Sequence, residues 1–219
     1  MAVITISREL GCEGDKIADL LCQERGYCRV DKAMLMHIAE EGGVDVEAVL
    51  AMERSFATRA RLISSEMTSL YSRQPTAFDR KTALDDHTYE RVVRRAMERF
   101  AEQGDVVIVG RGGQMILRDW PAVLHVHLYA PLEVRVQRLQ QRLNISEQEA
   151  RRLIAESDEQ KRQYIRHMHN KANWKDLKHY HLTINTGHIS PEVAAQTIIL
   201  AARHMENAQQ HSGGGPSSQ

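Results

Sequence analysis

Five short runs of apolar and β-branched residues recur along the chain, and segments with helical spacing separate them. The runs lie at residues 2–6, 27–30, 105–109, 123–128 and 182–185. Three of them are nearly continuous in apolar or β-branched residues, which is typical of strands buried on both faces of a parallel sheet. Strands that alternate with helices predict an α/β fold of three layers. We therefore expect a five-stranded parallel sheet between helices, with the first run at its centre.

Local signals predict where the helices between these runs begin and end. Gly26 is suited to end the first helix, and Asp31 to cap the N-terminus of the next one. Ser146 and Glu149 have the spacing of a capping box. Pro191 stands in the first turn of the last helix, where proline is tolerated.

The length of 219 residues suits one domain, which we expect to span residues 1–206. Residues 32–104 carry almost no strand signal and predict a helical insertion, while the polar tail at 207–219 predicts disorder. The 29 basic and 29 acidic residues balance, which gives no indication of nucleic-acid or membrane binding. Three cysteines without a C-x-x-C pair, and no apolar run of membrane-spanning length, lead us to expect a cytoplasmic protein with free thiols.

Residues 4–26, "ITISRELGCEGDKIADLLCQERG", combine a strand, a turn with two glycines and an amphipathic helix. Backbone N–H groups at a helix N-terminus form an anion site, and Gly11 and Gly14 let the chain wrap closely around phosphate oxygens. The consensus G-x-x-x-x-G-K-[ST] is absent, because Asp15 follows Gly14 and Lys16 comes one place late. Taken alone, the loop is equally compatible with phosphate binding and with a turn that needs glycines for steric reasons.

Further stretches follow in a characteristic order: "VDKAMLMHIAEEGG", "VVIVGRGGQMIL", "LHVHLYAPLEVRVQRL", "ISEQEARRLIAESDEQKRQYIRHM" and "LTINTGHIS". Together with the opening loop, they resemble the cytidylate kinase-like family of P-loop nucleoside monophosphate kinases, over nearly the whole chain. The resemblance implies ATP and Mg²⁺ as cofactors. It also implies transfer of the γ-phosphoryl group to a nucleoside monophosphate, with CMP or dCMP as the expected acceptor, and a helical lid at residues 134–175.

In this resemblance the phosphate loop is the cofactor-binding segment, made of Gly11, Cys12, Glu13, Gly14, Asp15, Lys16 and Ile17. Gly14 stands at the position of the phosphate-binding lysine, and Lys16 at that of the metal-ligating Ser/Thr. Glu13 places a carboxylate inside the loop, which repels phosphate unless it points outward or meets a metal. Arg8 first, Arg111 second (for the acceptor phosphate) and Lys16 third are expected to restore the missing charge, with Arg138 and Arg162 closing from above. The expected catalytic cations are Arg8, Lys16, Arg138 and Arg162.

The acceptor site implied by the resemblance contains Asp31, Arg111, Asp158 and Arg162. Arg111 lies in a "GRG" segment that resembles the G-R-D of cytidylate kinases, whose arginine contacts the monophosphate, and Gly112 replaces the aspartate. Asp158 and Arg162 are four residues apart and resemble an acid-and-arginine pair that grips the nucleotide. Each residue also has a simpler explanation: a solvated turn for Arg111, a solvated mixed-charge helix for the pair, and an N-cap for Asp31.

Three functions remain open from the sequence. A nucleotide kinase is the leading hypothesis. A nucleotide-binding regulatory protein without turnover is the second, because Glu13, Gly14 and Gly112 depart from the family pattern. A kinase for another small metabolite is the third, since the insertion would set acceptor specificity. Small-molecule nucleotides are the expected partners, and homo-oligomerisation stays open. The pairs His167/His169 and His179/His181 lack nearby carboxylates or cysteines, so no protein-bound metal is expected. Cys12 stands where the family usually has a serine. A helix N-terminus lowers a thiol pKa and would suit redox sensing, but a filler of serine size is the favoured interpretation of Cys12.

Overall fold

The protein is described here by a computed structural model that covers residues 1–31, 34 and 86–212. Five strands form one sheet in the order β2-β3-β1-β4-β5, and every pair of neighbours is parallel. Their bounds are Val3–Arg8 (β1), Cys28–Val30 (β2), Val106–Val109 (β3), Val123–Tyr129 (β4) and Leu182–Asn185 (β5). The predicted α/β fold with β1 at the centre of a five-stranded parallel sheet is confirmed.

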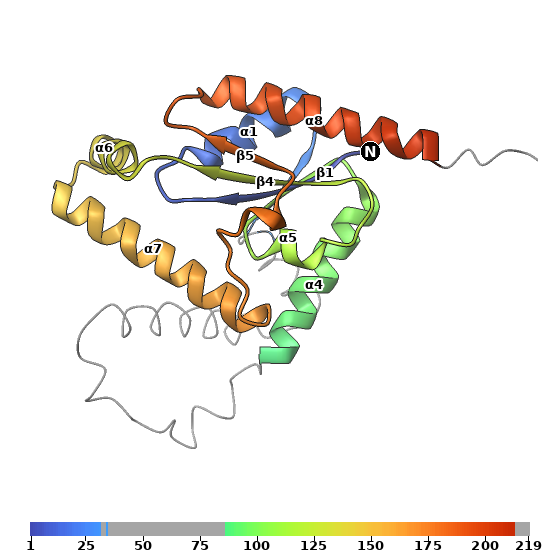
Figure 1. Ribbon diagram of the computed structural model, residues 1–219, viewed down its shortest axis with the longest axis horizontal. Coiled ribbons are helices and arrows are strands. Elements are labelled where there is room, and N and C mark those ends of the chain that lie inside the picture. Colours follow the sequence, from blue (N-terminus) through green and yellow to red (C-terminus); the bar gives the residue numbers. More distant parts are fainter. Residues whose placement is uncertain (32–33, 35–85, 213–219) are drawn as a thin grey trace, which may run out of the picture.

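Helices cover both faces of this sheet, as Figure 1 shows. The helices are α1 (Gly14–Arg25), α4 (Asp86–Gln103), α5 (Gly113–Ile116), α6 (Leu132–Leu143), α7 (Glu147–Met168) and α8 (Pro191–Ser212), with a 3-10 turn at Leu177–His179. On one face, Ile4 and Ile6 of β1 pack with residues of α1 and α8. On the other face, Val3 packs with residues of α4, α5 and α7. Side chains alternate between the faces of a strand, so the apolar β1 contributes to both cores.

The predicted helix boundaries agree with the structure wherever it describes them. Gly26 ends α1 in the left-handed conformation, φ 69°, and its N–H donates to the carbonyl of Cys22. The Ser146 side chain accepts the N–H of Glu149 at the start of α7. Pro191 is the first residue of α8. These short-range signals are therefore sufficient to fix the ends of three helices.

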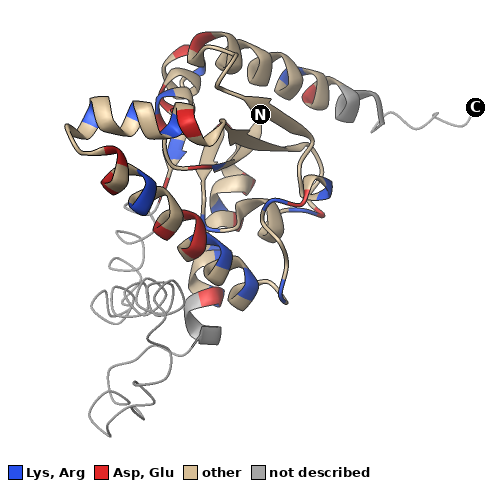
Figure 2. Ribbon diagram, turned by 60° about the vertical axis from the view of Figure 1, so that its left-hand side comes forward, with Lys and Arg blue, Asp and Glu red and all other residues tan. Residues whose placement is uncertain are grey.

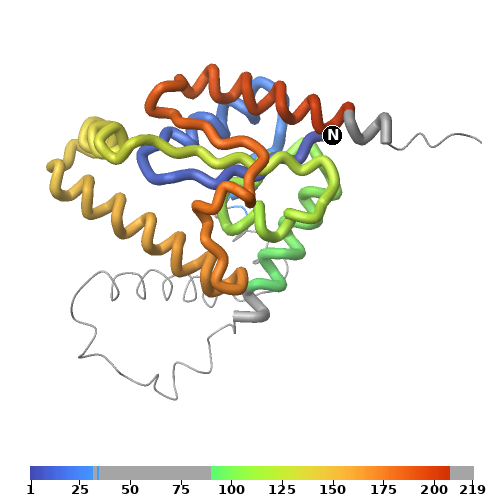
Figure 3. The backbone as a smooth tube through the Cα atoms, viewed as in Figure 1, coloured from blue at the N-terminus to red at the C-terminus, as the bar shows by residue number. Residues whose placement is uncertain are grey.

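The insertion predicted at 32–104 lies mostly outside the described residues, apart from residue 34 and the stretch from 86 onward. Residues 86–103 of it form α4, and residue 104 follows this helix. The predicted tail needs a correction, because α8 continues to Ser212 and residues 207–212 are helical. The ammonium of Met1 pairs with Glu206 at 2.6 Å, so the N-terminus lies beside α8, as the tube in Figure 3 shows. Among the described helices, none has the length and apolar character needed to cross a membrane.

Candidate functional site

A cavity of about 360 Å³ opens beyond the carboxyl ends of β1 and β3. Open parallel sheets bind their ligands at this edge. The cavity is bounded by the end of β1, by the turn after β3, by one face of α7 and by Trp174, with these lining residues: Ser7, Arg8, Val109, Gly110, Arg111, Gly112, Gln114, Ser157, Gln160, Lys161, Tyr164, Ile165 and Trp174. Two of the residues predicted from the sequence, Arg8 and Arg111, are among them.

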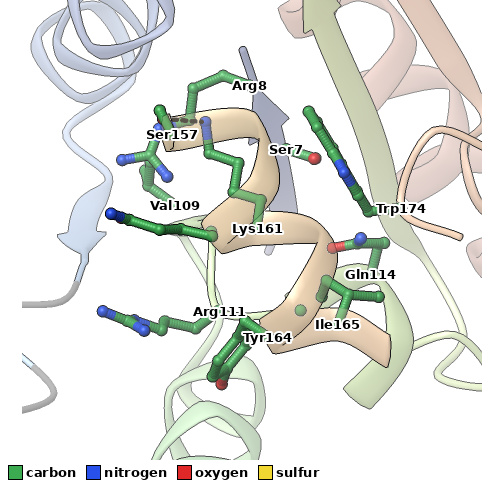
Figure 4. A pocket seen from close by; sticks show the side chains of 13 residues that line it. Ser7, Arg8, Val109, Arg111, Gln114, Ser157, Lys161, Tyr164, Ile165 and Trp174 are labelled. Atoms are coloured by element: carbon green, nitrogen blue, oxygen red, sulfur yellow. Dashed lines mark hydrogen bonds between the residues drawn. The ribbon is translucent and has the colours of Figure 1, made fainter. Parts of the chain in front are cut away.

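Three cationic side chains line this cavity, one each from β1, the turn after β3, and α7. Figure 4 shows Arg8 and Lys161 at one end and Arg111 farther along, beside Tyr164. The guanidinium carbon of Arg111 lies 5.3 Å from the centre of the Tyr164 ring. Arg8 is 3.5 Å from the carboxylate of Asp15, which is half-exposed. Among the described residues, the cavity is lined by these three cations and by no carboxylate, which suits an anion.

The loop between β1 and α1 is packed so closely at its two glycines that neither position has room for a Cβ atom. Gly11 has φ 85°, and a Cβ there would lie 2.9 Å from the backbone oxygen of Arg135. A Cβ on Gly14 would lie 2.7 Å from the Cβ of Arg8. The position at which the resemblance expects a lysine is thus closed to any side chain while Arg8 keeps this conformation. That the loop binds phosphate stays a prediction.

Glu13, whose carboxylate makes the loop less suited to an anion, has a partner on α6. It adopts φ 59° at the N-cap of α1, and its carboxylate pairs with Arg138 at 3.0 Å. Arg138 also donates to the backbone oxygen of Thr186 at 2.7 Å, and the Thr186 hydroxyl donates to the backbone oxygen of Cys12 at 2.9 Å. Arg138 thus neutralises Glu13 and braces the loop, whereas the sequence had suggested that it closes over phosphates.

An ion cluster that is buried at Glu9 and Arg135 and partly exposed at Asp158 and Lys175 joins the loop to the predicted lid. Arg135 of α6 donates two bonds to Asp158 of α7, at 2.9 and 3.2 Å, and pairs with Glu9 at 3.1 Å. Its Nε donates to the backbone oxygen of Leu10 at 2.7 Å. Lys175 pairs with Glu9 at 2.6 Å and with Asp158 at 3.4 Å. The side chains of Arg135 and Glu9 are only 5% and 8% exposed, so the cluster holds α6 and α7 against the end of β1.

The predicted pair of Asp158 and Arg162 is not formed, because each residue has another partner. Asp158 belongs to the ion cluster, and Arg162 makes two bonds to Glu159 at 2.7 and 2.8 Å. Arg162 lies on the exposed side of α7, where Figure 2 shows basic and acidic residues interleaved. The simpler explanation, a solvated mixed-charge helix, thus describes the surroundings of Arg162.

Lys16 points away from the cavity. Its Nζ pairs with Glu192 of α8 at 2.9 Å, which raises the pKa of Lys16, and its side chain is half-exposed. Ile17 is fully buried in the core, so its side chain packs and does not face the loop. Asp15 pairs with Arg29 at 3.0 Å as well as with Arg8.

Asp31 accepts the N–H of Met34 at 3.3 Å, as its predicted N-cap role requires, and also pairs with Arg29 at 3.2 Å. The rest of the predicted helix that it would cap lies outside the described residues.

Cys12 corrects another expectation. Burial raises the pKa of its thiol, and hydrogen bonding by the Gly14 backbone opposes this only in part. The side chain is fully buried, which agrees with the favoured interpretation that Cys12 fills the space of a serine. Cys12, Cys22 and Cys28 are all free, as predicted.

The turn after β3 explains the glycine that replaces the family's aspartate. Gly112 has φ 71°, and a Cβ there would collide with the Nε2 atom of His169, at the end of α7. Burial lowers the pKa of His169 to about 4, so the imidazole is neutral. In this chain the imidazole of His169 therefore occupies the space next to Gly112. In the part of the chain that the structure describes, no group of three or more His, Cys, Asp or Glu side chains is arranged so that it could bind a metal ion.

Several residues that line the cavity were not among the site residues predicted from the sequence. Ser157, Lys161 and Tyr164 come from successive turns of α7, and Trp174 follows that helix. The spacing of three and four residues places the first three on one helical face. This spacing was the signal in the sequence that could have identified the three residues. The many other charged residues on the same helix made it hard to recognise.

Comparison with known proteins relates this architecture to one family. The model of the cytidylate kinase-like family matches residues 3–188. A cytidylate kinase of Pyrococcus horikoshii is 32% identical over 147 residues, which are 67% of this chain and 74% of that protein. A cytidylate kinase of Pyrococcus abyssi is 31% identical over 146 residues, covering 67% and 78%. An uncharacterized protein from Eubacterium ventriosum shares the fold with a TM-score of 0.66 at 18% identity, over 93% of this chain and 99% of that one.

Proposed function

We propose, from the premise that this chain belongs to the cytidylate kinase-like family, that it transfers the γ-phosphoryl group of ATP to a nucleoside monophosphate. The observation that carries this proposal is the cavity that Arg8, Arg111 and Lys161 line beside a glycine loop. Phosphoryl transfer depends mainly on positioning the reactants and on neutralising charge, and such a cavity supplies both.

The donor side of the reaction is assigned to the loop and the first turn of α1. Gly11 and Gly14 keep side chains away from the loop backbone, and the N-terminus of α1 favours an anion. The triphosphate of ATP therefore fits this loop. Mg²⁺ binds ATP through its phosphates, usually with one or two carboxylates, and supplies charge neutralisation at the transferred group. Asp15, which is half-exposed in the first turn of α1 and pairs with Arg8 and Arg29, is the carboxylate that would hold the ion, whereas Lys16 cannot ligate a cation.

The acceptor side is assigned to the cavity between the turn after β3 and α7. Arg111 presents a guanidinium group, whose planar fork can bind two oxygens of a monophosphate. Tyr164, Ile165 and Trp174 supply apolar and aromatic surface for a base or a sugar. CMP and dCMP are the acceptors we propose, since the two relatives described above at 31% and 32% identity are cytidylate kinases.

A second function is supported by a specific observation. The loop has no lysine at position 14, and Lys16 pairs with Glu192 on the side of α8. A protein that binds nucleotides without turning them over would show the same features. The kinase remains our first proposal because Arg8 and Lys161 already place two positive charges at the end of β1.

The test begins with a thermal-shift panel of ATP, ADP and the nucleoside monophosphates with Mg²⁺, followed by an assay of ADP release. Acceptor-dependent ADP release with CMP or dCMP would support the kinase, and stabilisation by ATP without turnover would support the binding protein. Arg111→Ala should raise the KM for the monophosphate by about tenfold or more, because it removes a charged contact. Arg118→Ala is the matched control, since Arg118 is exposed and pairs only with the neighbouring Asp119 in the described structure.

A further inference from the structure

The loop of this protein lacks the positive charge that a phosphate loop normally carries, and in this structure no residue of the loop supplies it. Gly14 has no room for a side chain, because the stem of Arg8 lies where the Cβ would be. Lys16 is turned toward Glu192. Arg138 is engaged by Glu13. A compensating cation must therefore come from another part of the fold.

Lys161 is placed to be that cation. It extends from α7 into the cavity, on the end that it shares with Arg8 (Figure 4). Its Nζ is 3.4 Å from the hydroxyl of Ser157 and 5.6 Å from the centre of the Trp174 ring. Within the described parts of the chain it has no carboxylate partner, unlike Arg135, Arg138, Arg162 and Lys175. An ammonium group with this little compensation retains donors for a ligand.

The surroundings of Lys161 disfavour the protonated, positively charged form of its side chain. Desolvation, followed by the positive charge of Arg8, lowers the pKa of Lys161 to about 8. Asp158 and Cys12 act in the opposite direction, and Arg135 of α6 adds to the lowering. Asp158 is already bonded to Arg135 and Lys175. Arg8 has the half-exposed Asp15 as its carboxylate partner at 3.5 Å, and a bound anion would stabilise the charges of both Arg8 and Lys161.

The position of α7 is fixed independently of any ligand. The ion cluster of Glu9, Arg135, Asp158 and Lys175 ties this helix to the end of β1, and Asp158 is one turn from Lys161. Lys161 is therefore held over the start of the loop before a nucleotide arrives. Such preorganised charge is most effective when it meets charge that develops during the reaction.

We propose that Lys161, and not a residue of the loop, contacts the phosphate group that is transferred. The inference rests on the proposed function, because it assigns a residue within the same site. Lys161 takes the role of compensating cation that the sequence had suggested for Lys16, and it acts together with Arg8. In this arrangement Arg111 holds the phosphate of the acceptor, and Lys161 with Arg8 lies between that phosphate and the loop.

The experiment compares Lys161→Met, Lys161→Arg and Lys178→Met in two measurements. Lys161→Met removes the charge but retains the apolar length of the side chain. Lys178 is exposed and pairs with Asp176 within its own turn, which makes Lys178→Met a matched control. The first measurement is the calorimetric affinity for inorganic tripolyphosphate, which needs no catalysis. The second is the turnover of ATP with CMP.

We expect Lys161→Met to weaken tripolyphosphate binding by about tenfold or more and to lower turnover by roughly 10², as removal of a charge-stabilising donor does. Lys161→Arg should retain most of the binding, and Lys178→Met should match the unmodified protein. If Lys161→Met does not fold, Lys161→Gln serves in its place.

The outcomes separate this inference from the proposed function. Unchanged tripolyphosphate binding in Lys161→Met would overturn the inference, even if the protein proved to be an active kinase. Lack of tripolyphosphate binding by the unmodified protein would overturn it as well. Weakened binding in Lys161→Met, without turnover by the unmodified protein, would support the contact of Lys161 with phosphate and refute the kinase.

Discussion

Removing Arg135 should destabilise the protein far more than removing any exposed arginine. Its guanidinium group bonds Asp158 twice, pairs with Glu9 and donates to the backbone of Leu10, and its side chain is only 5% exposed. Arg135→Met would leave the carboxylate of Glu9, which is 8% exposed, with Lys175 as its one remaining partner in the described structure. Breaking a buried pair in this way costs about 3–5 kcal/mol. For a chain of this length we expect a fall in Tm of roughly 6–20 °C.

Urea unfolding at neutral pH, followed by far-UV circular dichroism, measures this change. Arg142→Met is the matched control, because Arg142 lies on the same helix and is exposed; its free energy of unfolding should stay within about 0.5 kcal/mol of the original. The triple variant Glu9→Gln, Arg135→Met and Asp158→Asn should be more stable than Arg135→Met alone, since it leaves no buried carboxylate without its partner. Equal stability of Arg135→Met and Arg142→Met would refute the argument that the cluster holds α6 and α7 to the sheet.

Three further predictions concern the site and its surroundings. Gly14→Ala should weaken ATP binding by about tenfold or more, because its Cβ would lie 2.7 Å from the Cβ of Arg8 and displace it; calorimetry that finds unchanged affinity would contradict this. Stability should fall as the pH drops from about 6.5 toward 4. Burial lowers the pKa of His125 and His127 to about 4, so the unfolded state binds their protons first. His127→Phe should reduce this fall by up to about 3 kcal/mol in urea titrations, and an identical pH profile would count against it. The affinity for tripolyphosphate should decrease above about pH 8, where Lys161 loses its proton. Arginine keeps its charge in this range, so Lys161→Arg should abolish the decrease between about pH 7 and 9.5. A parallel decrease in both proteins would exclude Lys161 as its cause.

The sheet could be predicted from the sequence because its strands are buried on both faces. Such strands must be apolar at consecutive positions, as in "VVIV" at Val106–Val109, and this leaves a signal that needs no knowledge of the partners. Helix ends were predictable for a similar reason. The side chain of Ser146 and the backbone of Gly26 act within their own turns, so the determinants lie next to each other in the chain.

The partners of the charged residues could not be predicted in the same way. Glu13 is neutralised by Arg138, and Glu9 by Arg135, in each case across more than 100 residues. Spacing along α7 suggested Arg162 as the partner of Asp158, but Arg135 approaches Asp158 from α6. Which cation faces the cavity depends on how α6 and α7 pack against the end of β1. That packing is a property of the tertiary structure and leaves no local pattern.

The measurement that tests the central claim most directly is the ADP released from ATP and Mg²⁺ with and without CMP or dCMP. We predict release that depends on the acceptor and falls by roughly 10² in Lys161→Met, while Lys178→Met retains it. Absence of acceptor-dependent release from the folded, unmodified protein would contradict the assignment of this cavity to phosphoryl transfer.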